Sequence, residues 1–307
     1  MTEIKEWQME PLDKWWSYRL ERDRRILHGH NKRTEMTNKE KFSVLSLGWG
    51  VQSFTLAAMA ALDEIEKPDL VVFADTTHEN ASAYELADKF TPWLGERGIT
   101  VDTVQAESTK PVLVTSGGVR KVVIPAFSKE LKTGAISQIN RNCTGDWKIS
   151  PVRKLVSAKL KEHGLKKTPD VAEMWLGITT DEWQRMRDAD VKWVKNRFPL
   201  IERRMSRMDC ITWLESKDLP VPDKSGCVFC PYMKTAYWKK SKSNQQSGDW
   251  QHAVDVDREI RSSPSYPEYE RFVHRLAVPL NDAVTIPEDF GASQSSFDEC
   301  DSGFCWT

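Results

Sequence analysis

The chain has 307 residues, and its 44 Lys and Arg residues nearly balance its 45 Asp and Glu residues, which leaves a net charge of −1. This balance excludes a global electrostatic attraction to nucleic acid, and 39% hydrophobic residues are typical of one large globular domain, or of one domain with a smaller cap. No apolar run approaches the roughly 18–20 residues that span a membrane, and the first residues lack an apolar signal core. We therefore expect a cytoplasmic protein without a membrane partner.

Residues 1–40 are predicted to form a basic helical extension. Between positions 13 and 33, seven Lys and Arg residues face three acidic ones, with Trp15, Trp16 and Tyr18 interleaved. One interpretation is an amphipathic helix that packs its Trp face on the core and solvates its charges. The other is contact with DNA or tRNA, because basic side chains bind phosphates and aromatic side chains stack on bases.

Residues 42–215 alternate strand-like and helix-like segments, which predicts a doubly wound α/β fold with a mainly parallel sheet. Residues 216–307 are predicted to form a region of helices and loops that ends in a flexible polar tail. Strands are expected at Phe42–Leu47, Leu70–Ala74, Val101–Gln105 and Met174–Ile178, and helices at Ser53–Asp63, Ala81–Arg97, Pro151–Glu162 and Asp209–Glu215.

A glycine loop follows the first expected strand. Glycine lets backbone N–H groups turn toward a ligand, and the start of the next helix adds partial positive charge, so phosphate is the natural ligand. A turn of small residues before a helix is also an ordinary structural element. The candidate binding loop consists of Gly48, Trp49, Gly50, Val51, Gln52 and Ser53.

Polar residues also follow the second expected strand, where Asp75, Thr76 and Thr77 come directly after Leu70–Ala74. Open α/β sheets bind ligands at the carboxyl ends of their strands. Asp75 is therefore a candidate ligand for Mg²⁺ or for a ribose hydroxyl.

These segments resemble the PP-loop nucleotide-binding superfamily, and within it the branch that is similar to sulfonucleotide (PAPS) reductases. The glycine loop lies where the superfamily has Ser-Gly-Gly-x-Asp-Ser, with Gly48, Trp49 and Gln52 replacing its first Ser, one Gly and its Asp. Four segments then match family motifs in order: Asp75-Thr76-Thr77 for Asp-Thr-Gly, Cys143 to Pro151 for Cys-x-x-x-x-Lys-x-x-Pro, Gly177 to Arg187 for Gly-Ile-Arg-x-Asp-Glu…Arg, and Phe198-Pro199-Leu200 for Tyr-Pro-Leu.

The resemblance implies an adenine nucleotide, ATP or else APS or PAPS, bound by the loop, by Asp75–Thr77 and by Gly177. Lys148 and Arg185 occupy family motifs near that nucleotide and are candidate catalytic residues together with Asp75. Arginine binds phosphate or sulfate bidentately, whereas lysine supplies a point charge. Each of these basic side chains is alternatively an ordinary surface charge.

The six cysteines of a cytoplasmic chain are expected to be metal ligands or redox catalysts rather than disulfide partners. Cys227 and Cys230 form a Cys-x-x-Cys motif followed by Pro231, so that both thiolates can face one metal centre. By the family resemblance, Cys143 and Cys210 complete a [4Fe–4S] cluster. Zinc with the same four ligands is the alternative, and Cys210 is alternatively a buried helix residue.

The tail carries a second pair of cysteines, Cys300 and Cys305. Glu299-Cys300 resembles the Glu-Cys-Gly motif that holds the nucleophilic thiol of sulfonucleotide reductases, with Asp301 in place of Gly. A swinging tail suits such a nucleophile, because it enters the site for chemistry and leaves for re-reduction. The alternative is an unstructured end whose cysteines have no role.

Three functions fit these motifs. The first is a PP-loop enzyme that binds ATP, activates a nucleic-acid acceptor with formation of AMP and transfers sulfur from a donor, with the cluster carrying or delivering that sulfur. The second is a reductase of APS or PAPS, in which the Cys300 thiolate attacks sulfur and a thiol reductant restores the enzyme. The third is a non-catalytic module that binds nucleotide or nucleic acid.

Overall fold

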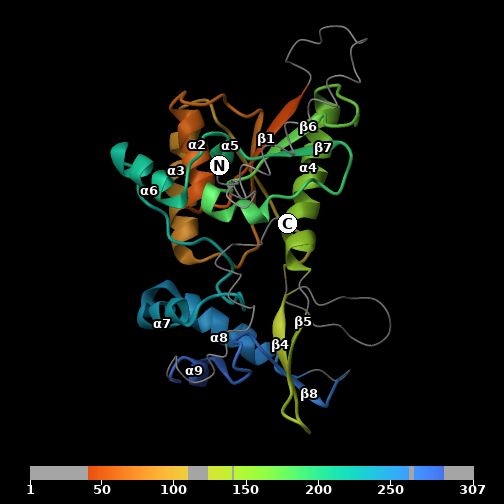
Figure 1. Ribbon diagram of the computed structural model, residues 1–307, viewed down its shortest axis with the longest axis vertical. Helices are drawn as coiled ribbons and strands as arrows, with labels where there is room; N and C mark the ends of the chain where they lie inside the picture. Colours follow the sequence, from red (N-terminus) through yellow and green to blue (C-terminus); the bar gives the residue numbers. More distant parts are fainter. Residues whose placement is uncertain (1–40, 110–123, 140–141, 263–265, 287–307) are drawn as a thin grey trace, which may run out of the picture. The chain divides into compact units, whose positions relative to one another are not determined.

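The larger sheet of the fold has five parallel strands in the order β3-β2-β1-β6-β7. Figure 1 labels β1, β6 and β7 of this sheet. The computed structural model describes residues 41–109, 124–139, 142–262 and 266–286, and the described residues from Phe42 onward belong to one compact unit. The sheet confirms the predicted α/β class. Its strands are β1 (Phe42–Ser46), β2 (Leu70–Ala74), β3 (Val101–Val104), β6 (Ala172–Trp175) and β7 (Val194–Arg197).

Helices cover both faces of this sheet. Successive strand residues point to opposite sides, and all five residues of β2 are buried, so each face packs against helices. Leu45, Phe73 and Trp175 point to one side and join the largest buried cluster with residues of α2, α3 and α6. Helix α4 lies on the opposite side (Figure 1), where it contacts β2 and β3. The helices around the parallel sheet are α2 (Val51–Ala61), α3 (Ala81–Gly95), α4 (Ser150–Glu162), α5 (Pro199–Glu202) and α6 (Arg207–Ser216), together with the 3₁₀ turn η2 (Thr180–Arg185).

A second, antiparallel sheet has the order β5-β4-β8. Strands β4 (Ala126–Glu130) and β5 (Ile136–Ile139) come from the segment expected to form the parallel sheet, whereas β8 (Tyr269–Phe272) comes from the C-terminal region. A hydrophobic cluster built around Trp147, Phe229 and Trp238 packs beside this sheet. The remaining elements are η1 (Thr144–Ile149), a π-helix, followed by α7 (Thr235–Ser243), η3 (Gln245–Ser247), α8 (Asp249–Glu259) and α9 (Leu280–Ala283).

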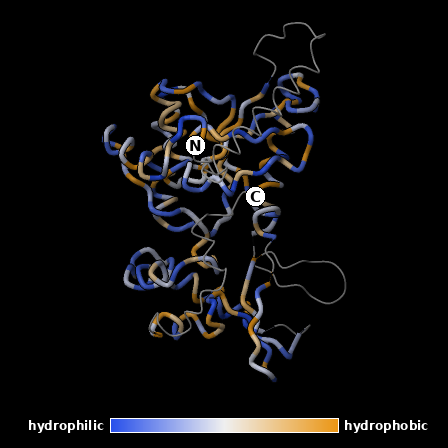
Figure 2. The backbone as a smooth tube through the Cα atoms, viewed as in Figure 1, coloured by the Kyte–Doolittle hydropathy of each residue, from blue (hydrophilic) through white to orange (hydrophobic). Residues whose placement is uncertain are grey.

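Hydrophobic and hydrophilic segments alternate along the chain (Figure 2). Accordingly, none of the described helices is both long and apolar enough to cross a lipid bilayer.

His274, which follows β8, is a buried histidine with 3% of its surface exposed. Its Nδ1 accepts a hydrogen bond from the Leu276 N–H at 3.3 Å, and burial, with a smaller effect of the Arg275 charge, lowers its pKa to about 4. An unfolded chain protonates this histidine near pH ~6.5, so between these values only the unfolded state binds the proton.

The free energy of unfolding is therefore expected to fall as the pH is lowered from about 6.5 toward about 4, by about 1.4 kcal/mol per pH unit from His274. Urea unfolding at pH 7.5 and pH 5 measures this loss. His274→Asn keeps a hydrogen-bond acceptor near the Leu276 N–H but does not titrate, and its unfolding free energy should change less with pH. Equal pH dependence in the two proteins would contradict the assignment.

Candidate functional site

The glycine loop Gly48–Ser53 connects the carboxyl end of β1 to the first turn of α2. The Ser53 hydroxyl accepts a hydrogen bond from the Gly48 N–H at 3.1 Å and donates one to the Gly50 carbonyl at 3.3 Å, which closes the loop on itself. Helix α2 has Gly50 as its N-cap, and no described side chain caps it. Its first N–H groups are therefore available to an anion.

Trp49 belongs to the core rather than to the surface of this loop. Its backbone lies in the left-handed region at a φ of 55°, which directs the indole inward, where it is 1% exposed. The ring packs against Phe54 and Phe73, with ring centroids 6.2 and 6.4 Å away. Of this predicted binding residue, only the backbone is thus placed for contact with a nucleotide.

Gly177, at the carboxyl end of β6, lies directly against the loop. A Cβ atom on Gly177 would be 2.8 Å from the Ser53 nitrogen and 3.1 Å from the Gln52 carbonyl carbon, so the site accommodates only glycine. The strand order reverses between β1 and β6. Such a reversal opens the crevice in which doubly wound sheets bind ligands, and both predicted glycine segments border it.

Gln52, which replaces the acidic residue of the family loop, is held by charged neighbours. Its Nε2 donates to Glu182 Oε2 at 3.3 Å, and its Oε1 accepts from Arg207 at 3.2 Å. Glu182 also pairs with Arg185 at 2.7 Å. Burial raises the pKa of Glu182, and the Arg185 charge opposes that shift. Predicted residue Arg185 therefore neutralises a partly buried carboxylate beside the loop.

Asp75, at the end of β2, accepts three hydrogen bonds. The donors are the Tyr84 hydroxyl, the Thr77 N–H and the Gln105 amide, each at 2.7 Å. A carboxylate offers about four acceptor sites, so three donors fix its orientation and leave one site for Mg²⁺ or a ribose hydroxyl. Thr77 itself has a φ of 61° and donates its hydroxyl to the Thr109 hydroxyl at 2.7 Å.

A buried ion pair joins the end of β2 to η1. Lys148 Nζ lies 3.0 Å from Glu79 Oε1, and the two side chains are 14% and 2% exposed. The Thr76 hydroxyl donates to the same Glu79 oxygen at 3.1 Å and lies 3.4 Å from the Cys227 sulfur. Glu79 was not predicted as a site residue, because the sequence shows it only as the last member of a polar run.

The Cys-x-x-Cys segment lies beside both the β1 and β2 ends. The Val228 N–H donates to the His78 carbonyl at 2.8 Å, and Cys227 forms an isolated β-bridge with Glu79. Two residues earlier, the Ser225 hydroxyl lies 2.6 Å from the position of a Cβ atom on Gly50. Burial raises the pKa of the Cys227 thiol, the Glu79 charge adds to that shift and Lys148 opposes it.

The structure separates Cys210 from the other proposed metal ligands. Cys143 and Cys227 pack against the cluster of Trp147 and Phe229, and Cys230 follows Cys227 in one hydrogen-bonded turn. Cys210 instead lies on the inward face of α6, within the cluster that α2 shares.

Burial raises the pKa of Cys210 to about 12, as in an inert structural cysteine. Within the described part of the chain, no three Cys, His, Asp or Glu side chains form a group that could hold a metal ion. These residues thus do not fit a four-thiolate cluster or zinc site in this arrangement, and the metal centre stays a prediction. Cys300, Cys305 and the basic stretch 13–33 lie outside the described residues.

Fold and site together define a doubly wound α/β protein with a glycine loop at the topological switch point of its parallel sheet. No protein-family model matches the chain. No curated protein matches it either.

Several solved structures are similar to this chain, among them the following two. One is a phosphoadenylyl-sulfate (PAPS) reductase from Candida auris in complex with phosphate, with 12% identity, a TM-score of 0.37, and coverage of 74% of this chain and 97% of that one. The other is a U34-tRNA thiolase from Methanococcus maripaludis with its [4Fe-4S] cluster, with 13% identity, a TM-score of 0.33 and 78% coverage of each chain.

Proposed function

We propose that this protein binds ATP at the loop Gly48–Ser53, uses it to activate an oxygen of a nucleic-acid acceptor with formation of AMP, and then transfers sulfur to that acceptor. One observation carries the proposal. The nucleotide loop and the Cys-x-x-Cys segment meet, with Ser225 against Gly50 and Cys227 beside Glu79. A nucleotide bound at the loop would therefore lie next to a thiol.

The chemistry has three steps. An oxygen of the acceptor attacks the α-phosphorus of ATP, and pyrophosphate leaves. The Cys227 thiolate takes the outer sulfur of a persulfide donor, whose own thiol leaves. This sulfur then adds at the activated carbon while AMP leaves with the oxygen, and a thiol reductant cleaves the remaining S–S bond. The N–H groups of the first turn of α2 would bind phosphate, and Asp75 would hold Mg²⁺ or a ribose hydroxyl. Lys148 would favour the thiolate of Cys227 by its positive charge. Because the described cysteines do not form a four-ligand group, no step is assigned to a metal cluster.

The test is turnover of the full chain with ATP, Mg²⁺, a persulfide donor, a thiol reductant and either RNA or DNA. We expect AMP and pyrophosphate in equal amounts and a sulfur-containing nucleoside after digestion, detected by mass spectrometry. Cys227→Ser should abolish sulfur incorporation and leave AMP formation. Cys210→Ala is the matched control, because that thiol lies in the α2–α6 core, and this variant should retain both activities.

Other outcomes would overturn this proposal in favour of a stated alternative. Thiol-dependent release of sulfite from APS or PAPS, lost in Cys300→Ser, would identify a reductase. Nucleotide binding without AMP formation on any RNA or DNA would identify a binding module. Loss of sulfur incorporation in a folded Cys210→Ala variant would show that Cys210 takes part in sulfur transfer.

A further inference from the structure

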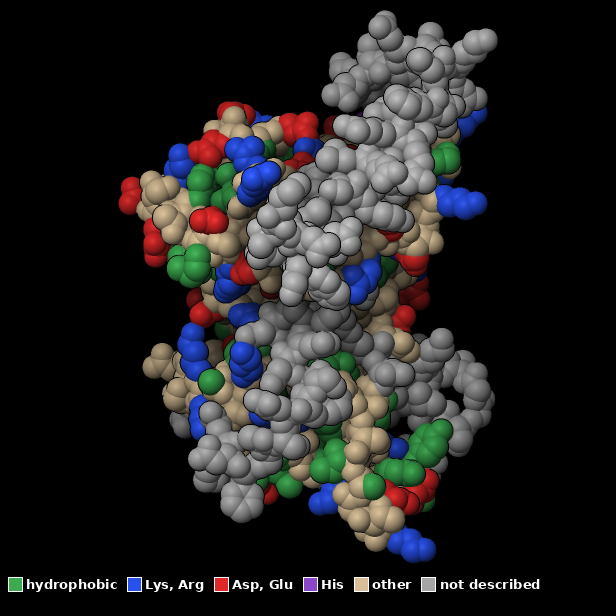
Figure 3. All heavy atoms as spheres, in the orientation of Figure 1, with side chains coloured by type: hydrophobic (Ala, Val, Ile, Leu, Met, Phe, Trp, Pro, Cys, Tyr) green, Lys and Arg blue, Asp and Glu red, His purple; other side chains and the backbone are tan. Residues whose placement is uncertain are grey.

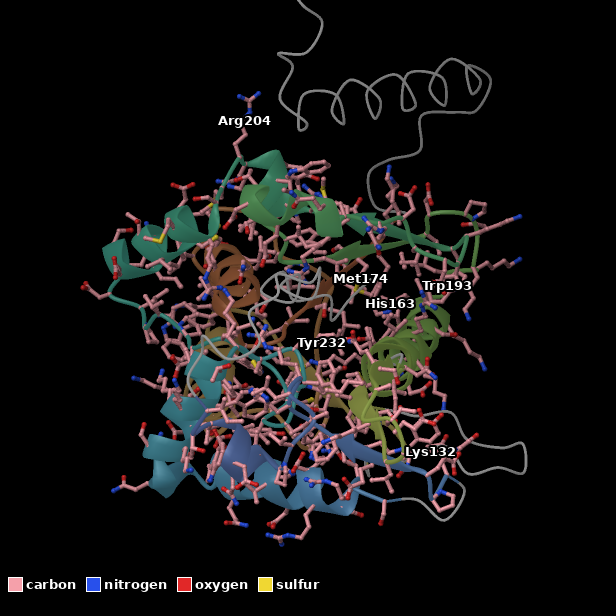
Figure 4. The ribbon with its side chains drawn as sticks, turned by 60° about the horizontal axis from the view of Figure 1, so that its bottom comes forward. Lys132, His163, Met174, Trp193, Arg204 and Tyr232 are labelled. Carbon is pink, nitrogen blue, oxygen red and sulfur yellow. The ribbon has the colours of Figure 1, made fainter. Side chains whose placement is uncertain are left out.

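A cavity of about 250 Å³ lies between α4 and the strands β6 and β7, on the sheet face opposite α2. Val152 and Val156 of α4 line it from one side, and Met174 and Leu176 line it from the sheet. Trp193 closes one wall, and Figure 4 shows it and Met174 beside α4. None of these residues belongs to the nucleotide or thiol site described above, so the cavity needs its own explanation.

The cavity is mostly apolar, and its polar lining consists of the Asn196 amide and the charged residues Arg153, Arg187, Asp188 and Asp190. Asn196 of β7 is in register with Met174 of β6, so both side chains lie on the α4 face and line the cavity. The Asn196 Nδ2 donates to the Arg187 carbonyl at 2.9 Å, which orients the amide. An oriented amide has one further N–H and an acceptor oxygen, and this pair matches the edge of a nucleobase.

The mouth of the cavity carries basic and acidic side chains, and two of the basic ones form ion pairs, Arg153 with Asp190 and Lys154 with Glu107. A wider depression shares Arg153 and Trp193 with the cavity and also borders Lys154 and Lys167. Lys167 Nζ lies 4.6 Å from the centre of the Trp193 ring, and Arg153 forms a two-point ion pair with Asp190. The guanidinium fork that binds this carboxylate has the geometry that binds a phosphate. An aromatic ring flanked by basic groups is the combination that holds a single nucleotide strand.

Two adjacent residue pairs connect the cavity to the proposed reaction site. Leu176 lines the cavity, whereas the next residue, Gly177, lies against the nucleotide loop. Ile149 lines the cavity, whereas the preceding residue, Lys148, pairs with Glu79 beside Cys227. A ligand in the cavity would therefore approach both the nucleotide and the thiol from the far side of the sheet edge.

Resting on the proposed function, we infer that this cavity binds the acceptor base of a single-stranded or unpaired nucleic-acid segment, with Trp193 stacking on the base and the Arg153 and Lys167 side chains at the mouth binding its phosphates. The volume favours a base over a larger guest, since drug-sized ligands occupy roughly 300–1,000 Å³. Basic and acidic side chains are interspersed on the face in Figure 3, in keeping with a net charge of −1. Recognition of the nucleic acid would then depend on this local site rather than on the overall charge of the protein. A base in a duplex would have to be flipped out of the helix to enter the cavity.

The experiment measures binding of fluorescent single-stranded DNA and RNA oligonucleotides, and separately of ATP, to the full chain. Trp193→Ala should raise the oligonucleotide Kd about tenfold or more, as expected for loss of one stacked base, and leave the ATP Kd unchanged. Trp193→Phe keeps an aromatic face and should retain most of the affinity. Trp213→Ala is the matched control, because this tryptophan of α6 also lies beneath a lysine, with Lys217 Nζ 5.7 Å from its ring centre.

Each outcome separates this inference from the proposed function. An unchanged oligonucleotide Kd in Trp193→Ala, with AMP formation intact, overturns the cavity assignment alone. A matching loss of ATP binding overturns it in favour of the adenine of ATP as the occupant. Oligonucleotide binding that depends on Trp193, without AMP formation, supports the cavity and rejects the proposed reaction. Circular dichroism confirms that each variant is folded.

Discussion

Replacing Lys148 by Met is expected to lower the free energy of unfolding by about 3–5 kcal/mol, because it leaves the Glu79 carboxylate buried without its cationic partner. Glu79 is 2% exposed at its side chain, and its Oε2 has no hydrogen-bond partner among the described residues. Solvent therefore cannot replace the lost ammonium group. Urea unfolding of wild type and Lys148→Met, followed by circular dichroism, measures the difference.

The double variant Lys148→Met/Glu79→Gln is the control for this prediction. Replacing a buried ion pair by neutral groups of similar shape is often nearly neutral in stability, so the double variant should recover most of the loss. It also separates two roles of Lys148. If the double variant is stable but forms no AMP, Lys148 acts on the nucleotide. If it forms AMP but incorporates no sulfur, Lys148 acts on the thiol. If it is both stable and fully active, the lysine serves only to neutralise Glu79. A single variant as stable as wild type would contradict the buried pair.

The parallel sheet could be predicted from the sequence because its signals are local. Leu70–Ala74 is a continuous apolar run, as expected for a strand buried on both faces, and it forms β2 without a shift of either end. Expected helices 53–63 and 151–162 correspond to α2 and α4 within two residues at each end. The carboxyl ends of β1 and β2 also lie side by side as the polar motifs indicated.

The second sheet could not be predicted in the same way. Strand β4 pairs with β8, and Phe127 lies opposite Phe272, so the pairing joins residues far apart in the chain. No turn or repeat in the sequence marks such a contact. Strand β7 was also missed, because Val194 is followed by three polar residues and the segment lacks an apolar run.

Burial explains where the predicted site and the structure differ. The sequence identifies Trp49 and Cys210 by motif position, but both side chains point into the α2 core. Conversely, Glu79 is charged and therefore expected at the surface, yet Lys148 and Thr76 hold it inside. A motif specifies which residues are present, whereas packing decides which of them face a ligand.

Gly177→Ala is expected to weaken ATP binding at least tenfold and to lower the free energy of unfolding by about 1–3 kcal/mol, the usual cost of overpacking. The new methyl group would meet backbone atoms of Ser53 and Gln52 at 2.8 and 3.1 Å. A side chain could rotate away, but these atoms belong to the first turn of α2. Either the loop or the end of β6 must move, and the N–H groups proposed to bind phosphate move with it.

Gly95→Ala is the matched control, because Gly95 ends α3 and no atom lies within 4 Å of its Cβ position. This variant should bind ATP like wild type. Titration calorimetry with ATP and Mg²⁺, together with urea unfolding, separates a general loss of stability from a local change at the loop. If Gly177→Ala loses stability but keeps its ATP affinity, the nucleotide does not lie against the first turn of α2, and the binding site must be sought elsewhere along the carboxyl edge of the sheet. If both change while Gly95→Ala changes neither, the contact between β6 and the loop is what shapes the nucleotide site.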